Sequence, residues 1–120
     1  MVFNCIAVNQ DDHVKNISFL MGKDGVWHLS PAYDITFSYD TSNIWLKQHQ
    51  MSVNNKSTNI LLDDLLEAGK SMDIKRGKCI SIINKIKTSV SNFRRIAQEC
   101  GVNDSNIARI ESILSKEGLK

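Results

Sequence analysis

A regular spacing of apolar residues in the second half of the chain constrains the fold more than any other feature. Between residues 74 and 99, apolar side chains recur at steps of four, three, four, three and four: Cys79, Ile83, Ile86, Val90, Phe93 and Ala97. This spacing follows the 3.6-residue turn of an α-helix, so these side chains form one continuous apolar stripe. We therefore predict a long amphipathic helix over residues 74–99, with Asp73 as its N-cap and Gly101 just beyond its end.

Shorter helical patterns flank this helix and extend the predicted helical part to residues 58–118. Residues 60–69, ILLDDLLEAG, predict a short helix that Thr58 caps and Gly69 ends. A last helix is predicted over residues 104–116. Its buried face is expected to consist of Ile107, Ile110 and Leu114.

The first half of the chain has a different pattern. Residues 17–21, ISFLM, and residues 26–29, VWHL, are rich in β-formers and are separated by the turn sequence GKDG, which predicts a β-hairpin. The apolar run at residues 1–8 fits either a buried strand or the end of a helix. We therefore predict an α+β fold, mostly α-helical, in which a small β-hairpin packs on a helical bundle.

Composition and charge exclude several classes of function. The formal net charge of +2 is too small to indicate binding to nucleic acid or to an anionic membrane. The basic residues of the long helix lie opposite its apolar stripe, as on any solvated helix face, so we expect no direct contact with nucleic acid. No apolar run approaches the roughly 18 residues that span a bilayer, and residues 1–12 have no basic leader region.

The three cysteines argue against a disulfide framework. They are odd in number and widely spaced, at Cys5, Cys79 and Cys100, and no CxxC motif is present. Reduced thiols are typical of this pattern, and we expect a cytoplasmic protein with no membrane partner.

A polar segment, NQDDHVKN at residues 9–16, separates two apolar runs in the first half. Within it Asp11 and Asn16 are five positions apart, and Asp34 follows the predicted hairpin in the sequence SPAYDI. A carboxamide and a carboxylate are oxygen ligands that suit Mg²⁺, and a second acid could take a proton from a hydroxyl. The same spacing is common in solvated turns, so spacing alone leaves both a phosphoryl-transfer site and a structural loop open.

The segments DDHVKNISFL and LSPAYDIT, with the hairpin between them, resemble the catalytic and metal-binding segments of HipA-family serine/threonine kinases. These kinases are toxins of bacterial toxin–antitoxin modules and have a protein-kinase-like fold. The resemblance covers about residues 1–100 and includes the run MSVNNKSTNILLDDLLEAG. It implies a kinase-like C-terminal lobe over residues 1–120, with the catalytic loop, hairpin and metal-binding motif at residues 9–34. The matching residues are Asn9, Asp11, His13, Lys15, Asn16, Ser18, Pro31, Tyr33 and Asp34.

The resemblance also implies roles for individual residues. Asp11 is expected to be the catalytic base, while Asn16 and Asp34 are expected to hold Mg²⁺ against the β- and γ-phosphates of ATP. Lys15 is expected either to neutralise developing phosphate charge or to pair with Asp11. The other matching residues with an expected role are those that shape the loop: Asn9, His13 and Tyr33.

Other chemistry-bearing side chains near these motifs are expected to be structural. Asp12 receives no catalytic role, because its position varies in the family that the chain resembles. We expect His28 and His49 to be solvent-facing or structural, and Trp27 and Trp45 to pack against other side chains.

Parts that a complete kinase needs have no counterpart among residues 1–120. None of the six glycines lies in a GxGxxG-like cluster, and only ten residues precede Asp11. We expect the chain to be an N-terminally truncated kinase lobe, inactive alone, whose ATP-covering N-lobe is supplied in cis or in trans. We also expect apolar area around Val2, Phe3 and Ile6 to be exposed and to favour homo-oligomers. The alternative is a non-catalytic interaction module that binds an antitoxin or another regulatory partner.

Overall fold

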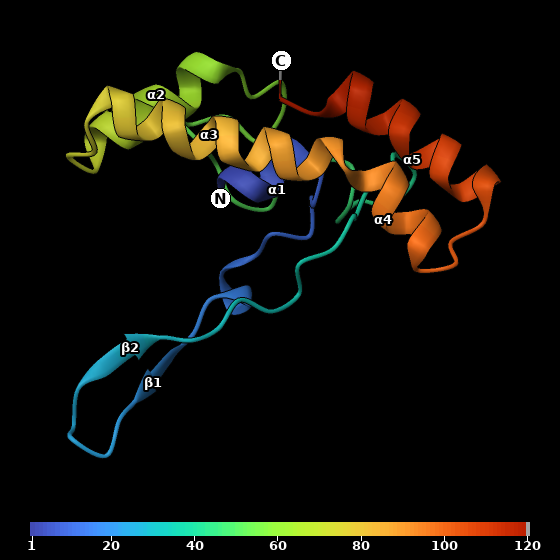
Figure 1. The fold of residues 1–120 in the computed structure, drawn as a ribbon. Coiled ribbons are helices and arrows are strands. Elements are labelled where there is room, and N and C mark those ends of the chain that lie inside the picture. The colour runs from blue at the N-terminus through green and yellow to red at the C-terminus, as the bar shows by residue number, and fades with distance from the viewer. Residues whose placement is uncertain (120) are drawn as a thin grey trace.

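The computed structural model describes residues 1–119, and it is mostly helical with one two-stranded antiparallel hairpin (Figure 1). The α+β class predicted from the sequence is confirmed. The elements in chain order are α1 (Val2–Ala7), the short 3₁₀-helix η1 (Val14–Asn16), β1 (Phe19–Met21), β2 (Trp27–Leu29), α2 (Leu62–Ser71), α3 (Arg76–Ser91), α4 (Phe93–Glu99) and α5 (Asp104–Glu117).

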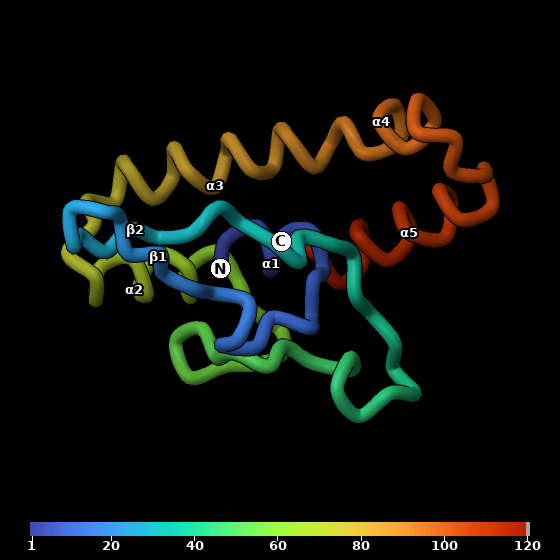
Figure 2. Tube along the Cα trace, turned by 90° about the horizontal axis from the view of Figure 1, so that it is seen from below, coloured from blue at the N-terminus to red at the C-terminus, as the bar shows by residue number. Residues whose placement is uncertain are grey.

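The core lies where α1 and α2 pack against the N-terminal part of α3. In the view of Figure 2, α1 lies below α3, and the later, green part of the segment between the hairpin and α2 passes below both. The apolar run at residues 1–8 is thus a helix rather than a strand. The buried core cluster consists of Cys5, Ile6, Val53, Leu65, Leu66, Cys79 and Ile83. Ile6 is 6% exposed, so the expected exposure of this residue is wrong, while Val2 and Phe3 are half-buried.

Helix α1 ends in a conformation that is unusual for a β-branched residue. Val8 has φ 53° and ψ 48°, in the left-handed region that a side chain branched at Cβ strongly disfavours. Val8 is 1% exposed, and its carbonyl accepts a hydrogen bond of 3.1 Å from the Ser38 amide. Burial and this bond hold the turn that carries the chain from α1 into residues 9–16.

The hairpin forms as predicted but does not pack on the helices. Its strands pair Phe19 with Leu29 and Met21 with Trp27, and Gly25 takes φ 77° in the connecting turn. Every strand residue is exposed, and Figure 1 shows the hairpin extending away from the helical body. The radius of gyration, 15.7 Å, accordingly exceeds the roughly 14 Å of a compact domain of this length.

The two tryptophans do not pack either. Trp27 lies on the hairpin and is 64% exposed, and Trp45 in the following loop is 66% exposed. The sequence expectation for both is therefore wrong, because the elements that carry them are not covered by the helical body.

The predicted long helix is divided into α3 and α4 at Asn92. The Asn92 amide donates to the Thr88 carbonyl at 2.8 Å, and the Ser91 hydroxyl donates to the same carbonyl at 2.8 Å. These side chains compete for a backbone acceptor and favour a break in the helical ladder. Gly101 does follow the end of α4, with φ 76°, and the Val102 amide bonds to the Ala97 carbonyl at 2.9 Å as in a Schellman motif.

Both predicted N-caps are wrong. Lys75 rather than Asp73 is the N-cap of α3, and Asp73 instead takes φ 57° in the turn after α2. Helix α2 begins after Leu61 rather than at Thr58. Its end is also later than predicted: Gly69 is buried inside the helix, and a side chain there would overlap the Sγ of Cys79 on α3.

A buried carboxylate organises the start of α2. Asp64, 4% exposed, accepts hydrogen bonds from the Leu61 amide at 2.8 Å, from Asn54 Nδ2 at 2.9 Å and from Lys56 Nζ at 2.9 Å. These donors lower the pKa of Asp64 from 3.8 to about 2, and the hydrogen bond from Lys56 has the largest effect. The network ties the loop that precedes α2 to the first turn of the helix.

We expect Asp64→Asn to flatten the acid dependence of stability. Because the folded-state pKa lies below the ordinary value, the ionised form of Asp64 stabilises the fold above about pH 4, and this stabilisation is lost as the pH falls toward 2. Urea unfolding followed by circular dichroism at pH 7, 4 and 2.5 measures the effect. Asp63→Asn, which changes an exposed carboxylate in the same helical turn, is the control. Equal acid dependence in wild type and Asp64→Asn would refute the assignment.

Two further features concern the cysteines and the apolarity of the helices. All three cysteines are free, with Cys5 and Cys79 buried and Cys100 exposed. No helix within residues 1–119 combines the length and the apolarity that crossing a membrane requires.

Candidate functional site

The hairpin brings Asn16 and Asp34 into direct contact. Pairing of its strands continues beyond β1 and β2 through the Ser30 amide, which donates to the Ser18 carbonyl at 2.9 Å. The residues on either side of this pairing therefore meet, and Asn16 Nδ2 donates to Asp34 Oδ2 at 2.8 Å. The same nitrogen donates to the Asp11 carbonyl at 2.9 Å. Three of the predicted site residues are thus linked by one amide group.

A second set of bonds fixes the segment that carries Asp34. Asp34 has φ 55°, a left-handed conformation that Asp tolerates better than most residues. Its carbonyl accepts a hydrogen bond of 3.1 Å from Asn9 Nδ2, and Asn9 is 1% exposed. The Gln10 amide donates to the Ser38 carbonyl at 2.9 Å, so the two segments run side by side.

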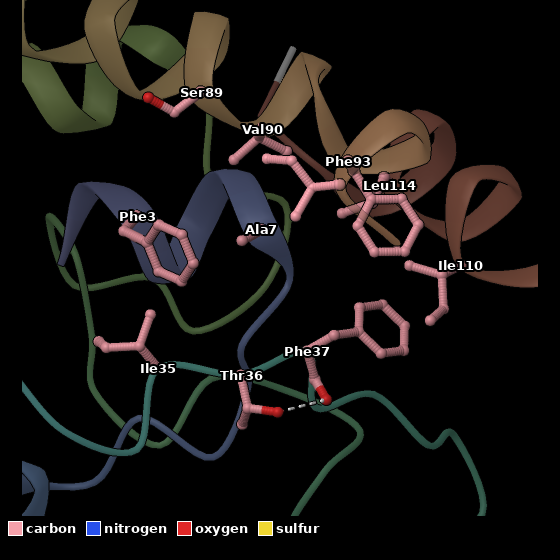
Figure 3. A pocket seen from close by; sticks show the side chains of 11 residues that line it. Phe3, Ala7, Ile35, Thr36, Phe37, Ser89, Val90, Phe93, Ile110 and Leu114 are labelled. Carbon is pink, nitrogen blue, oxygen red and sulfur yellow. Dashed lines mark hydrogen bonds between the residues drawn. The ribbon is translucent and has the colours of Figure 1, made fainter. Parts of the chain in front are cut away.

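Apolar side chains anchor the residues directly after Asp34. In Figure 3, Ile35 lies near Phe3 of α1, and Phe37 points toward Ile110 of α5. With neighbouring side chains they line an apolar cavity of about 240 Å³ between α1, α3, α4 and α5. This packing connects the position of Asp34 to the helical body.

Tyr33 and His13 contact the loop at residues 9–16 in different ways. The Tyr33 hydroxyl donates to the Lys15 carbonyl at 2.6 Å, which joins the segment after the hairpin to η1. His13 is the N-cap residue of η1, and its Nδ1 atom is buried without a hydrogen-bond partner. Lys15 is exposed, and within residues 1–119 no ion pair joins it to Asp11.

Asp11 is partly exposed and lies outside the lining of the cavity beside Asn16 and Asp34. Its carboxylate is 40% exposed and lies 3.9 Å from His13 Nε2. The structure therefore links Asp11 to Asn16 through its backbone carbonyl and leaves its carboxylate open to solvent.

A cavity of about 320 Å³ adjoins the Asn16–Asp34 pair. Its polar lining includes Asn9, Asp12 and His13, and two of these residues contribute buried atoms without hydrogen-bond partners, Asn9 Oδ1 and His13 Nδ1. Its apolar lining includes Met1, Phe3, Ile17, Leu29, Ala32, Ile35 and Met51. A cavity with apolar walls and a few convergent polar groups is typical of a small-molecule site.

The oxygen donors at this cavity fit a hard divalent cation only in part. Asp34 offers a carboxylate, and Asn16 offers an amide oxygen once its nitrogen is held by the Asp11 carbonyl. Residues 1–119 contain no group of three or more His, Cys, Asp or Glu side chains arranged to hold a metal ion. The donor set therefore suits Mg²⁺ bound together with phosphate oxygens and waters, rather than a cage made only by protein.

Sequence reasoning missed the role of Asp12 in the structure of this loop. Asp12 is 5% exposed, and its Oδ2 lies 2.8 Å from Nδ1 of the buried His49. Its Oδ1 accepts hydrogen bonds from the Gln50 amide at 2.7 Å and the Met51 amide at 3.2 Å. The expectation that His49 is structural agrees with this contact, while His28 is exposed on the hairpin.

The electrostatics of Asp12 follow from these contacts. Burial by itself would raise the pKa of Asp12, but the hydrogen bond and charge of His49, with the Met51 and Gln50 amides, bring the pKa below its ordinary value. The group is therefore a carboxylate at neutral pH. The only sequence signal for it was the second acid of the Asp11–Asp12 pair, which does not reveal a partner 37 positions away.

Comparison with known proteins identifies one family. The family model for the HipA-like C-terminal domain matches residues 1–112, which is nearly the whole chain. Searches of curated proteins and of solved structures gave no match.

Proposed function

The chain belongs to the HipA-like C-terminal domain family, and from this premise we propose that it is the magnesium- and phosphate-binding lobe of an ATP-dependent serine/threonine protein kinase. The observation that carries the proposal is the contact between Asn16 and Asp34 beside a cavity of about 320 Å³. Two residues 18 positions apart supply the carboxamide and carboxylate that the reaction requires.

Each residue of the site has a distinct part in this proposal. Asp34 and the amide oxygen of Asn16 would hold Mg²⁺, and the bound ion would neutralise charge on the β- and γ-phosphates of ATP. Asp11, whose carboxylate is partly exposed, would accept the proton of the attacking protein hydroxyl. Lys15 is exposed in η1 of the same loop and would contribute positive charge near the transferred phosphoryl group.

Metal binding would change one contact that the structure shows. Asn16 Nδ2 now donates to both Asp34 and the Asp11 carbonyl. Turning the Asp34 carboxylate toward a cation would break the first bond and leave the second, which keeps the amide oxygen directed away from Asp11. The Asn16–Asp34 bond thus holds the two groups together when no cation is bound.

The proposed lobe would need a second lobe for catalysis. Phosphoryl transfer depends on positioning and on charge stabilisation from all sides, and residues 1–120 contain no glycine-rich phosphate loop. We propose that an ATP-covering lobe is supplied in cis or in trans and that these 120 residues alone have no kinase activity. By family analogy, the complete kinase would act in toxin–antitoxin growth control beside an antitoxin protein.

A titration of the chain with Mg²⁺ and ATP tests the proposal. We expect backbone amide shifts in residues 9–16 and 33–35 that require both ligands together, with weak affinity. No shifts at millimolar concentrations of both would count against the binding role. Steady phosphorylation of a protein by the purified chain would refute the proposed inactivity.

A second candidate function, an interaction module, is favoured by the exposed face of the hairpin. The strand register places four apolar side chains on one face, and each is more than half exposed: Phe19, Met21, Trp27 and Leu29. Exposed apolar patches of this kind mark surfaces that contact another protein. The partner would be the ATP-covering lobe, an antitoxin or another regulatory protein.

We expect this face to make the isolated chain self-associate at high concentration. Replacing the cross-strand pair Met21 and Trp27 with Lys and Glu should yield a monomer, because charges on the face oppose association while their attraction preserves strand pairing. Light scattering across a concentration series measures the change.

The neighbouring cross-strand pair provides the control. Leu20 and His28 lie on the opposite face, so the same Lys and Glu replacements there should leave self-association in place. A monomeric wild-type chain at high concentration would contradict the prediction.

A further inference from the structure

Asp12 connects the loop at residues 9–16 to a segment that no sequence motif associates with it. The carboxylate accepts bonds from His49, Gln50 and Met51, which are 37, 38 and 39 positions later in the chain. Asp12 and His49 are both buried, at 5% and 7% exposure. A buried carboxylate with three donors is a strongly held anchor, because losing those bonds would leave a charge without partners.

The anchor lies at the centre of the proposed site. Asp12 stands between Asp11 and His13, and both Asp12 and Met51 line the cavity of about 320 Å³ beside Asp34. Asn9 and Asn16 fasten the two ends of the loop to the Asp34 segment. Asp12 fastens its middle to the opposite segment, so the loop is held from two sides.

We propose that Asp12 and His49 are positioning residues that set the conformation of the loop bearing Asp11 and Asn16, and that they place Met51 in the cavity wall. This inference rests on the proposed function for its meaning in catalysis, but the anchor itself is a property of the unliganded chain. Asp12 touches no reacting group in this proposal and acts through its neighbours.

The position of the anchor distinguishes this role from general support of the fold. The partners of Asp12, which are His49, Gln50 and Met51, lie in a loop outside every helix and strand, so the anchor joins two loop segments and not two helices. Loss of the anchor should therefore loosen the loop far more than the helices.

Hydrogen exchange on the unliganded chain is the first measurement. In Asp12→Ala, we expect the amides of Asn16 and Ile17, which bond to the His13 and Val14 carbonyls, to exchange at least about tenfold faster, while the amides of α3 change much less. His49→Ala should act in the same direction. Asp12→Asn keeps an oxygen for the two backbone amides, so it should restore most of the protection.

Titration with Mg²⁺ and ATP is the second measurement, with Asp63→Ala as the control because it removes an exposed carboxylate of α2. We expect Asp12→Ala to lower the affinity for Mg²⁺ and ATP about tenfold, as measured from the amide shifts at Asn16 and Asp34. This is the lower end of the loss in affinity when a group that supports a metal ligand is removed. The affinity of Asp12→Asn should stay close to that of wild type, and the affinity of Asp63→Ala should equal that of wild type.

The outcomes separate the two proposals. If wild type shows no ligand-dependent shifts while Asp12→Ala still speeds exchange in the loop, the proposed function fails and the anchor stands. If loop exchange in Asp12→Ala equals that of wild type, or if α3 exchange rises as much as loop exchange, the positioning role is wrong. Unchanged ligand affinity in Asp12→Ala would also overturn it.

Discussion

Asp34→Asn is expected to abolish the Mg²⁺-dependent binding of ATP to this chain. The replacement removes the charge from the carboxylate to which Asn16 donates, while Asn tolerates the backbone at φ 55° and preserves the side-chain shape. Affinity should fall by at least the ~10–100-fold that loss of a group supporting a metal ligand costs. Calorimetric titration with Mg²⁺ and ATP measures the loss.

A control distinguishes this effect from unfolding. Asp63→Asn changes the same type of side chain on the exposed face of α2 and should bind as wild type does. Both variants should keep the helical signal of wild type in circular dichroism. If Asp34→Asn bound ATP with Mg²⁺ as tightly as wild type does, the assignment of Asp34 as a metal ligand would be wrong.

Gly69→Ala is expected to destabilise the fold, although alanine is normally the better residue inside a helix. In an open position the change would stabilise α2 by up to about 1 kcal/mol. Here the new Cβ would overlap Cys79 Sγ, which is buried between α2 and α3. Overpacking of this kind costs about 1–3 kcal/mol, so we expect a net loss in the free energy of unfolding, measured in urea.

A double-mutant cycle locates the cause. Cys79→Ala removes the sulfur that the new methyl group meets and leaves Cys79 Cβ at 3.7 Å, an ordinary contact distance. The double variant should therefore be more stable than Gly69→Ala alone, with a favourable coupling energy of about 1 kcal/mol or more. Additive effects of the two substitutions would show that the contact between Gly69 and Cys79 is not the cause.

The sequence predicts elements of this fold better than their ends and their packing. The apolar stripe from Cys79 to Ala97 is real, but Asn92 divides the helix through a side-chain bond to Thr88 that apolar spacing does not report. Gly101 is predictable because a glycine directly after a helix has one common role. Gly69 has the same appearance in the sequence, yet it is required by contact with Cys79 and not by the end of a helix.

The candidate site shows the same division. The contact between Asn16 and Asp34 follows from a hairpin that the turn sequence predicts, so a local pattern was sufficient to bring them together. The partners of Asp12 come from a loop without helix or strand, and no periodic pattern connects them. The sequence also could not show that the hairpin extends away from the helical body. Alternation of apolar and polar residues identifies the two faces of a strand, but it does not show which elements cover them.

Val8 has a consequence for how far this chain could be stabilised. Its left-handed backbone, at φ 53°, lies immediately before the loop that carries the proposed catalytic residues, and Asp34 takes φ 55° in the facing segment. Two residues with side chains thus occupy conformations that glycine adopts without strain, one on each side of the site. Glycine at Val8 would relieve the backbone but lose the burial of a side chain that is 1% exposed. Glycine or asparagine at Asp34 would relieve the backbone at the expense of the site. Stability of the backbone and the proposed chemistry therefore place opposing requirements on the residue at Asp34.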